Sequence, residues 1–493
     1  MTPMAVIRRP LALMRPLHLP PPQAWLVAGA LSAAVFASAA LFGRPALFAS
    51  LAVGSMAAAI ALYEPRTLGP MAALALPLEI SKLAFPFLET RSELGGGLGP
   101  TSIVDAGRLV FALAFVVWLV RPGRPRADVI PSSPMTLPLA LLFAVFALST
   151  PYALDVSAAR TESIRLLFSL GSFALVPFFV RDAASLRWTL YAFVFSAGSL
   201  AVAGVYQQLT DTFFWNPGLG LYGERRINAT FADPNHFARF LLEAIVIATM
   251  LWPFAHRRVR YAFLLPAIAV ALLTLVFTGS RGAWAIGAIA LPVAVLALPI
   301  ERRTRLRLLG MGAAVLAVVL LVVAAISPYF TKRLDTFTFG FEAAGARPYL
   351  VKAGLNMFAD HPVTGVGAGG YQSSFENDYL RYKDPKIKAN ITISHTSAVT
   401  IMAELGLIGM TAVAFVAVRF GGYVRDVLAH APPEARMAAV AMTLVAAIIV
   451  LGSQTEGRFL EDPYLWLAAG LVVAIDQITR REAVHARASE AGA

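Results

Sequence analysis

Long apolar runs, separated by short charged or Gly/Pro-containing stretches, make up most of this chain. About 20 consecutive apolar residues suffice to cross the hydrocarbon core of a bilayer as a helix, whereas a β-barrel would show short alternating strands. The pattern therefore predicts an all-α, polytopic transmembrane bundle with about 12–14 spans. The candidate spans are 23–42, 45–63, 69–88, 106–121, 135–153, 163–180, 186–207, 236–254, 260–278, 282–299, 306–326, 397–418, 436–453 and 461–479.

Arginines gather in alternate connections between these spans, for example at 121–126, 257–260 and 302–307. Short cytoplasmic loops carry an excess of Lys and Arg, so alternation places these connections and both termini in the cytoplasm. Most of the net charge of +12 is then explained by the excess of Lys and Arg in cytoplasmic loops. The bilayer, with anionic lipid contact as a by-product, is the expected partner, and no nucleic acid is needed to explain the charge.

The spans and the arginine pattern divide the chain into five segments. We expect a cytoplasmic N-terminal segment (1–22), helices 1–11 (23–326), a long loop on the outer side (327–396), helices 12–14 (397–479) and a cytoplasmic tail (480–493). Loops longer than about 15 residues are usually functional or disordered. This one is rich in Phe, Tyr, Leu and Val, so we expect it to contain short, ordered helices.

Composition narrows the chemistry. The chain is 58% hydrophobic and 14% charged, against roughly 25% charged residues in soluble domains. The absence of cysteine excludes disulfides, thiol catalysis and thiolate metal sites. No P-loop or nucleotide-binding glycine fingerprint is present. Asp233 or Asn235 is a candidate N-cap for the helix at 236–254, and capping is the default role for Asp233. Without further carboxylates nearby we expect no metal site and no cofactor.

His395 lies in the run ISHTSAVTIMAELGLIGM, where an irregular segment gives way to an apolar helix. Histidine can exchange a proton near neutral pH, so His395 is a candidate general base, although a single histidine at a helix start can also be only an interfacial polar residue. Glu404 follows nine residues later, roughly 13 Å deeper along a helix. An ionisable residue at that depth is a functional candidate.

Four arginines depart from the charge rule, because Arg225, Arg226, Arg281 and Arg347 lie on the outer side. Each could extend its side chain to the interface. Together they favour an anion site, since guanidinium groups bind phosphate oxygens in a bidentate fork. Such a site could stabilise the charge that develops on a departing diphosphate, while a histidine takes the proton of an attacking hydroxyl.

Four ordered motifs, spread over roughly residues 200–420, extend this picture. The chain resembles the bacterial O-antigen ligase and O-antigen polymerase superfamily of membrane glycosyltransferases. The motifs that carry the resemblance are RINATFADPNHFARFL, TGSRGAW, ARPYLVKAGLNMFADHPVTGVGAGGYQ and SHTSAVTIMAELGLIG. The resemblance implies an inverting, metal-independent glycosyltransferase that moves a glycan from an undecaprenyl-diphosphate carrier to an acceptor hydroxyl. It also implies a multi-pass protein of the bacterial inner membrane with its active site, and the long loop, on the periplasmic face.

Carried over motif by motif, Arg226 and Arg281 would hold the diphosphate and His395 would activate the acceptor. Arg347 would line the loop cavity, and Arg225 could replace Arg226. Glu404 joins the substrate-binding candidates. Two features depart from the family: Thr396 stands where an Asn is common, and the spans outnumber those of many ligases.

The acceptor therefore stays open. It would be a lipid A core for a ligase and a second lipid-linked glycan for a polymerase. The alternative class is a membrane transporter or flippase of lipid-linked oligosaccharide. That class favours internal repeats and helices broken at mid-membrane, and the sequence shows no convincing repeat.

Overall fold

The computed structural model describes residues 54, 56–78, 106–120, 133–212, 226–231, 233–326, 347–383, 385, 394–456 and 459–491. Every element in these ranges is a helix, and none is a strand, which confirms the all-α prediction. Six of these helices are long and apolar enough to cross a membrane, so the protein is a polytopic helical membrane protein. The predicted first span, 23–42, and Arg225 lie outside the described residues.

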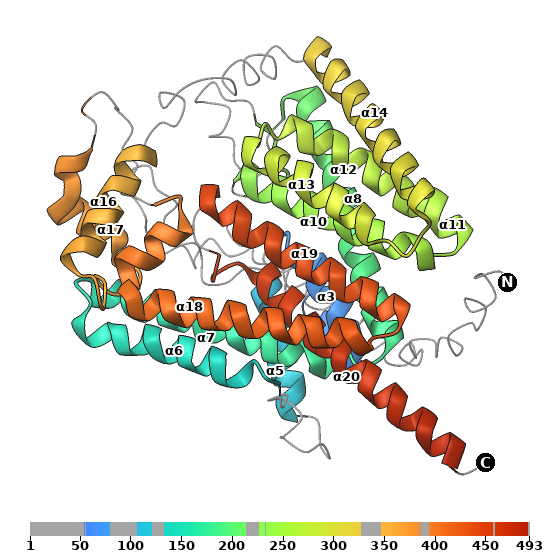
Figure 1. Ribbon diagram of the computed structural model, residues 1–493, viewed down its shortest axis with the longest axis horizontal. Coiled ribbons are helices and arrows are strands. Elements are labelled where there is room, and N and C mark those ends of the chain that lie inside the picture. Colours follow the sequence, from blue (N-terminus) through green and yellow to red (C-terminus); the bar gives the residue numbers. More distant parts are fainter. Residues whose placement is uncertain are drawn as a thin grey trace, which may run out of the picture.

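The elements follow one another along the chain as shown in Figure 1. They are η1 (Pro65–Thr67), α3 (Leu68–Ala75), α5 (Ala106–Val120), α6 (Thr136–Ser149), η4 (Thr150–Tyr152), α7 (Val156–Phe179), α8 (Ala183–Thr210), α10 (Pro234–Leu251), η5 (Trp252–Phe254), α11 (Arg257–Val259), η6 (Arg260–Leu264), α12 (Leu265–Phe277), α13 (Arg281–Ala297), α14 (Arg302–Ile326), α16 (Arg347–Asp360), α17 (Tyr371–Ser374), η8 (Phe375–Tyr379), η9 (Leu380–Tyr382), α18 (Ser397–His430), α19 (Pro433–Glu456) and α20 (Pro463–Ala491).

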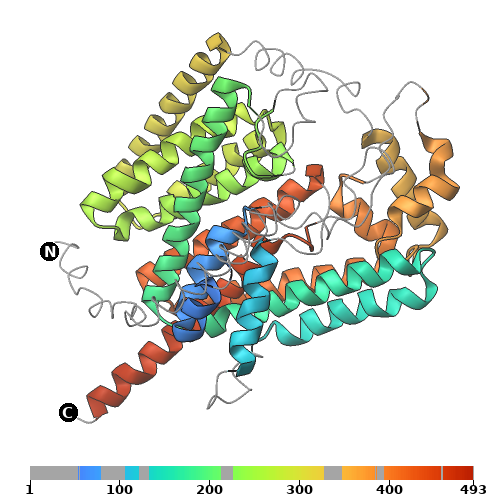
Figure 2. The same cartoon turned by 180° about the vertical axis from the view of Figure 1, so that it is seen from behind.

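The centre of the bundle is formed by α10, α19 and α20. Helix α19 packs against α10, α13, α18 and α20, while α20 also packs against α7. An aromatic cluster joins α8, α10 and α20: the ring of Phe240 lies 5.0 Å from Phe193 and 5.4 Å from Tyr464, centroid to centroid. On the face seen in Figure 2, α3 packs against α8 and α5. Burial of apolar side chains between these helices therefore stabilises the scaffold that positions the site.

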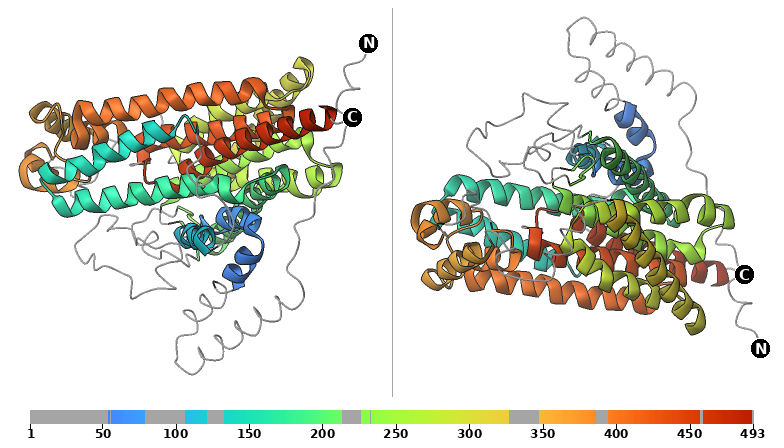
Figure 3. Two further views of the ribbon diagram at one scale, coloured as in Figure 1. Left: turned by 90° about the horizontal axis from the view of Figure 1, so that it is seen from below. Right: turned by 90° about the horizontal axis from the view of Figure 1, so that it is seen from above.

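Residues 347–383 form a compact cap at one end of the bundle, which we call the loop end (Figure 3). The cap has its own small core, in which Tyr349, Met357 and Phe375 are buried. It contains α16, α17, η8 and η9, so the prediction of short helices within the long loop is confirmed for these residues.

The cap is fastened to a break in α18. Gly406 has φ +58° and ψ −153°, which interrupts the helix. The backbone groups freed there bond to the cap: Gly367 N–H donates to the Glu404 carbonyl at 2.8 Å, and Leu407 N–H donates to the Pro362 carbonyl at 2.9 Å. A Cβ on Gly365 would lie 2.3 Å from the Glu404 carbonyl carbon. Only glycine therefore permits this approach and this positive φ without strain.

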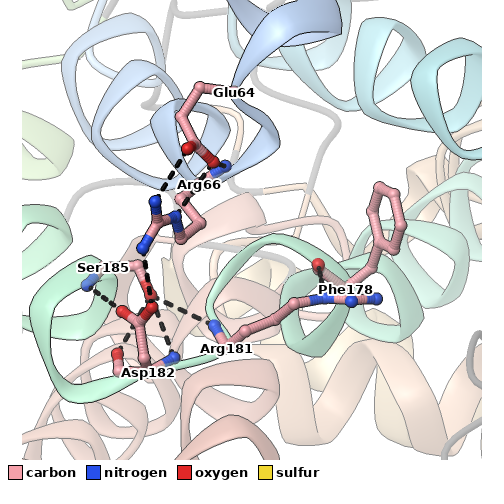
Figure 4. A network of polar contacts seen from close by, with 6 residues as sticks. All are labelled: Glu64, Arg66, Phe178, Arg181, Asp182 and Ser185. Atoms are coloured by element: carbon pink, nitrogen blue, oxygen red, sulfur yellow. Dashed lines mark hydrogen bonds and ion pairs between the residues drawn. The ribbon is translucent and has the colours of Figure 1, made fainter. Parts of the chain in front are cut away.

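A polar network closes the opposite end of the bundle (Figure 4). Arg66, just before α3, donates to Glu64 at 2.7 Å and to Asp182 at 3.0 Å. Asp182 also caps α8 in a capping box: its carboxylate accepts from Ser185 N–H, and the Ser185 hydroxyl oxygen accepts from Asp182 N–H. Arg66 thereby joins α3 to the turn between α7 and α8, far along these helices from the cap.

Candidate functional site

Of the five site candidates that the structure describes, Arg226, Arg281, Arg347 and His395 lie at helix starts of the loop end, and Glu404 lies deeper in α18. The first four come from the segment before α10, the first residue of α13, the first residue of α16 and the segment before α18. The parity of the predicted spans placed them on one side, and hydrogen bonds between the helix ends bring their segments together in the structure.

Arg226 bridges two helix ends. Its Nε donates to the Thr278 carbonyl at 2.8 Å, at the end of α12, and its Nη2 donates to Asn235 Oδ1 at 2.6 Å, in the first turn of α10. Asp233 caps α10 as the sequence predicted, because its Oδ1 accepts from Asn235 N–H at 2.7 Å. The arginine side chain is thus held in a defined orientation by the ends of two helices.

Arg281 opens α13 directly after Ser280, whose side chain caps the helix by accepting from Ala283 N–H at 3.4 Å. The next residue, Gly282, lies against the end of α19: a Cβ there would lie 2.8 Å from Thr455 Oγ1. A side chain at Gly282 would require the Thr455 hydroxyl to move. The start of α13, with Arg281, is therefore set against Thr455.

Thr455 also contacts Arg347. The Nη2 of Arg347 donates to the Thr455 carbonyl at 2.9 Å, although the arginine as a whole is exposed. Two arginine-bearing helix starts, from α13 and α16, thus meet at the same residue of α19. Helix N-termini favour anions on their own account, so the arrangement concentrates positive potential at this point.

His395 is partly buried two residues before α18. The start of that helix is tied to the end of α19, because Ser397 Oγ donates to the Ser453 carbonyl at 3.0 Å and Ala398 N–H donates to Gln454 Oε1 at 3.2 Å. Thr396, the departure from the family pattern, is the N-cap residue and makes no capping hydrogen bond through its side chain.

Burial lowers the pKa of His395 below its ordinary value, and the positive charge of Arg347 lowers it further, whereas Asp233 acts in the opposite direction. These two charges act on His395 from the start of α16 and from the N-cap of α10. An imidazole with a lowered pKa is neutral at neutral pH. It can therefore accept a proton, as a general base must.

Glu404 lies deeper in α18 and is 5% exposed. Its Oε2 accepts from Gly369 N–H at 2.9 Å and its Oε1 accepts from Tyr371 N–H at 3.2 Å. These bonds fasten the cap to α18. A substrate-binding role for Glu404 stays a prediction; in the structure its carboxylate bonds to the cap, and the residue also lines a cleft beside α18.

The sequence reasoning missed two kinds of residue at this end. Thr455 is a small polar residue closing an apolar helix, and nothing local marks it as the meeting point of two arginine segments. Glu162 and Glu461 line a cleft beside α18, and only the i, i+3 pairing of Glu162 with Arg165 could have drawn attention to them. Among the described residues, no group of three His, Asp or Glu side chains is placed to hold a metal ion.

Part of the chain also matches a known protein family. Residues 266–414 match the sequence model of the O-antigen ligase family. The match includes Arg281, Arg347, His395 and Glu404, whereas Arg226 precedes it. No curated protein matches the chain. The segment from α12 to the kinked α18 is thus similar to the O-antigen ligase family, which confirms the resemblance of this chain to the O-antigen ligase and polymerase superfamily.

Proposed function

We propose that the protein transfers a glycan from an undecaprenyl-diphosphate carrier to an acceptor hydroxyl, by an inverting and metal-independent reaction. The observation that carries the proposal is that Arg347 and the helix start that carries Arg281 both contact Thr455, the former by a hydrogen bond and the latter through Gly282, and that Arg347 acts on a histidine whose pKa is lowered. It combines cations for a diphosphate with a neutral base for a hydroxyl. The O-antigen ligase family match supports a glycosyl-transfer reaction in general terms.

The chemistry assigns a separate task to each side of the site. His395 takes the proton of the acceptor hydroxyl as its oxygen attacks the anomeric carbon of the donor sugar. The bond between that carbon and the diphosphate oxygen breaks, and undecaprenyl diphosphate leaves with the bonding electron pair. Arg226, Arg281 and Arg347 stabilise the charge that develops on the diphosphate. Attack from the face opposite the leaving group inverts the anomeric configuration.

The membrane placement follows the arginine pattern of the sequence. In this proposal the protein lies in the bacterial inner membrane, with both termini in the cytoplasm and the loop end in the periplasm. The polyisoprenoid tail then stays among lipids and apolar helices while the diphosphate reaches the arginines. The acceptor is a lipid A core or a second lipid-linked glycan.

A single reconstitution experiment tests the proposal and separates its two versions. The purified protein is incubated with an undecaprenyl-diphosphate-linked repeat unit, with and without lipid A core, and the products are sized. A ladder without core indicates a polymerase, and a core-linked product indicates a ligase. Absence of any new glycosidic bond in either reaction contradicts the proposal.

The transporter or flippase alternative has one feature in its favour, the break in α18 at Gly406. In transporters such breaks expose backbone groups to substrate or ions. Here the carbonyls of Ala403 and Glu404 accept from Val366 and Gly367 of the cap instead. Movement of lipid-linked glycan across protein-containing vesicles, without transfer, would favour that alternative.

A further inference from the structure

Tyr371, the first residue of α17, is a buried polar residue of the cap to which the proposed reaction assigns no task. It is 1% exposed. A Cβ on Gly354 of α16 would lie 3.0 Å from Cε2 of the Tyr371 ring, so the ring packs directly against the backbone of α16. Buried polar groups in native proteins have hydrogen-bond partners. The partners of the Tyr371 hydroxyl therefore show which segments this residue connects.

The Tyr371 hydroxyl connects two segments of the site. It donates to the Leu350 carbonyl, in the first turn of α16, and it is also hydrogen-bonded to the Ser394 side chain. Leu350 lies three residues after Arg347, and Ser394 directly precedes His395. One buried hydroxyl thus bonds both to the helix turn that begins with Arg347 and to the residue next to the proposed base.

Ser394 in turn fixes the backbone around His395. Its Oγ accepts from Thr396 N–H at 3.2 Å, so the Ser394 side chain bridges the two residues that flank the histidine. Ser394 is itself 3% exposed. Beyond the histidine, the chain is joined to α19 through Ser397. The turn that carries His395 is therefore tied to the cap on one side, through Tyr371, and to the bundle on the other.

The phenol of Tyr371 is unsuited to acid–base catalysis. Burial raises its pKa far above the ordinary value, and the charge of Glu404 raises the pKa further, so Tyr371 keeps its proton at neutral pH. Its backbone is fixed as well, because the Tyr371 N–H donates to Glu404 Oε1 at 3.2 Å. A neutral side chain held by packing and by hydrogen bonds is suited to support a functional group rather than to react.

We propose that Tyr371 is a positioning residue for transfer, because its hydroxyl holds the turn of His395 at a fixed distance from the first turn of α16 and hence from Arg347. The assignment rests on the proposed function, in which His395 takes the acceptor proton while Arg347 stabilises the departing diphosphate. Both events occur at one sugar carbon, so the separation of the two side chains must match the substrate. A misplacement of about 1 Å can reduce a rate about 100-fold.

The test removes the hydroxyl and keeps the ring. In Tyr371→Phe we expect kcat to fall about tenfold, while the KM values for donor and acceptor change by less than about twofold, because no substrate contact is lost. The acid limb of kcat/KM should move to higher pH. Burial and Arg347 both lower the pKa of His395, and a turn that is held less firmly weakens both influences.

Tyr379→Phe is the matched control. Tyr379 is 4% exposed and belongs to the same small core of the cap, but its hydroxyl donates to Asp360 Oδ2 at 2.6 Å, at the other end of α16 from Arg347. Each variant loses one phenol hydrogen bond to α16, so we expect similar falls in the thermal unfolding midpoint. Only Tyr371→Phe should change kcat and the pH profile. Equal losses of kcat in the two variants would show a merely structural role.

A titration of His395 separates failure of this inference from failure of the proposed function. Histidine ring signals are followed by NMR against pH, without substrate, in wild-type protein, Tyr371→Phe and Tyr379→Phe. The His395 signal is identified by its absence from His395→Gln. We expect a higher pKa of His395 in Tyr371→Phe than in the other two proteins. That result without transfer by the wild-type protein contradicts the proposed function alone, whereas an unchanged titration overturns the assignment of Tyr371.

A second variant guards against misfolding of Tyr371→Phe. Ser394→Ala removes the other partner of the same hydrogen bond with a minimal change of volume. We expect kcat to fall and the pKa of His395 to rise, as in Tyr371→Phe, with both KM values nearly unchanged. Wild-type kcat and wild-type titration of His395 in a folded Ser394→Ala protein contradict the proposal.

Discussion

The carboxylate of Glu404 holds the backbone of Gly369, whose N–H donates to Oε2 at 2.9 Å. The second oxygen, Oε1, accepts from Tyr371 N–H at 3.2 Å. A buried carboxylate on a membrane helix thus accepts hydrogen bonds from two backbone groups of the cap. Glu404 thereby fixes the position of the cap, which carries Arg347, relative to α18, which follows the proposed base His395.

Replacement of Glu404 by Ala should destabilise the protein. Two buried N–H groups would lose their acceptor, and each such loss costs about 1–3 kcal/mol. Thermal unfolding in detergent measures the effect. Glu376→Ala is the control, since Glu376 is an exposed acidic residue of the same cap. A Glu404→Ala protein of wild-type stability with a raised substrate KM would instead support the substrate-binding role predicted from sequence.

Gly406→Ala should also destabilise the junction. A non-glycine residue at φ +58° and ψ −153° costs about 1–3 kcal/mol, and the new Cβ would lie 2.5 Å from the Val363 carbonyl. The control is Gly421→Ala in the same helix, where a Cβ meets nothing within 4 Å. There we expect a gain of up to about 1 kcal/mol from helix propensity. Equal unfolding midpoints for the two variants would show that the break is dispensable.

The break in α18 marks a limit of what the sequence could predict. Apolar periodicity predicts a helix through Glu404, Gly406 and Gly409, and that helix exists. Periodicity carries no information about a positive φ, and the groups that stabilise the break come from Pro362–Gly369, some forty residues earlier. The sequence therefore located the helix and its unusual residues, while the tertiary partner decided what they do.

The site shows the same division. Alternation of spans placed Arg226, Arg281 and Arg347 on one side with His395, and the structure has all four at the loop end. Their common neighbour, Thr455, could not be found, because its role depends on contacts with Gly282 and Arg347. The side of the membrane on which a loop lies can be predicted from the charge pattern along the chain. A contact between two distant helices leaves no such pattern in the sequence.

The pH dependence of transfer should report on His395. Burial and Arg347 lower its pKa, so the neutral base persists below pH 6.5 and kcat/KM should fall only as pH drops further. Arg347→Gln removes a lowering charge and should move this acid limb to higher pH. Asp233→Asn removes the charge that raises the pKa, keeps a good N-cap residue, and should move the limb to lower pH. Shifts in the same direction, or no shift, would argue against His395 as the base.

His395→Ala should yield a folded, membrane-inserted protein that has lost nearly all transfer. General bases typically contribute about 10²–10⁴-fold to the rate. The thermal midpoint should change little, because the fastening of α18 to α19 runs through Ser397 and Ala398 instead. The matched comparison is His256→Ala, an exposed histidine before α11. Near-normal transfer by His395→Ala would remove His395 from the catalytic role.

Asp182→Asn separates stability from catalysis. Burial would raise the pKa of Asp182, but hydrogen bonds from Ser185 and Arg66 outweigh it and hold the pKa below its ordinary value. The carboxylate therefore stabilises the fold above pH 3.9, the usual value for Asp, and this contribution is lost as pH falls through the lowered pKa. Because the Asp182 side chain is 43% exposed, solvent screening limits the effect to about 1 kcal/mol or less.

We expect the Asp182→Asn variant, which keeps a capping side chain, to unfold at slightly lower temperature than wild-type protein at pH 7. Transfer activity should be unaltered, because the network lies at the end of the bundle opposite Arg281 and His395; a large loss of activity at normal stability would mean that the two ends are coupled.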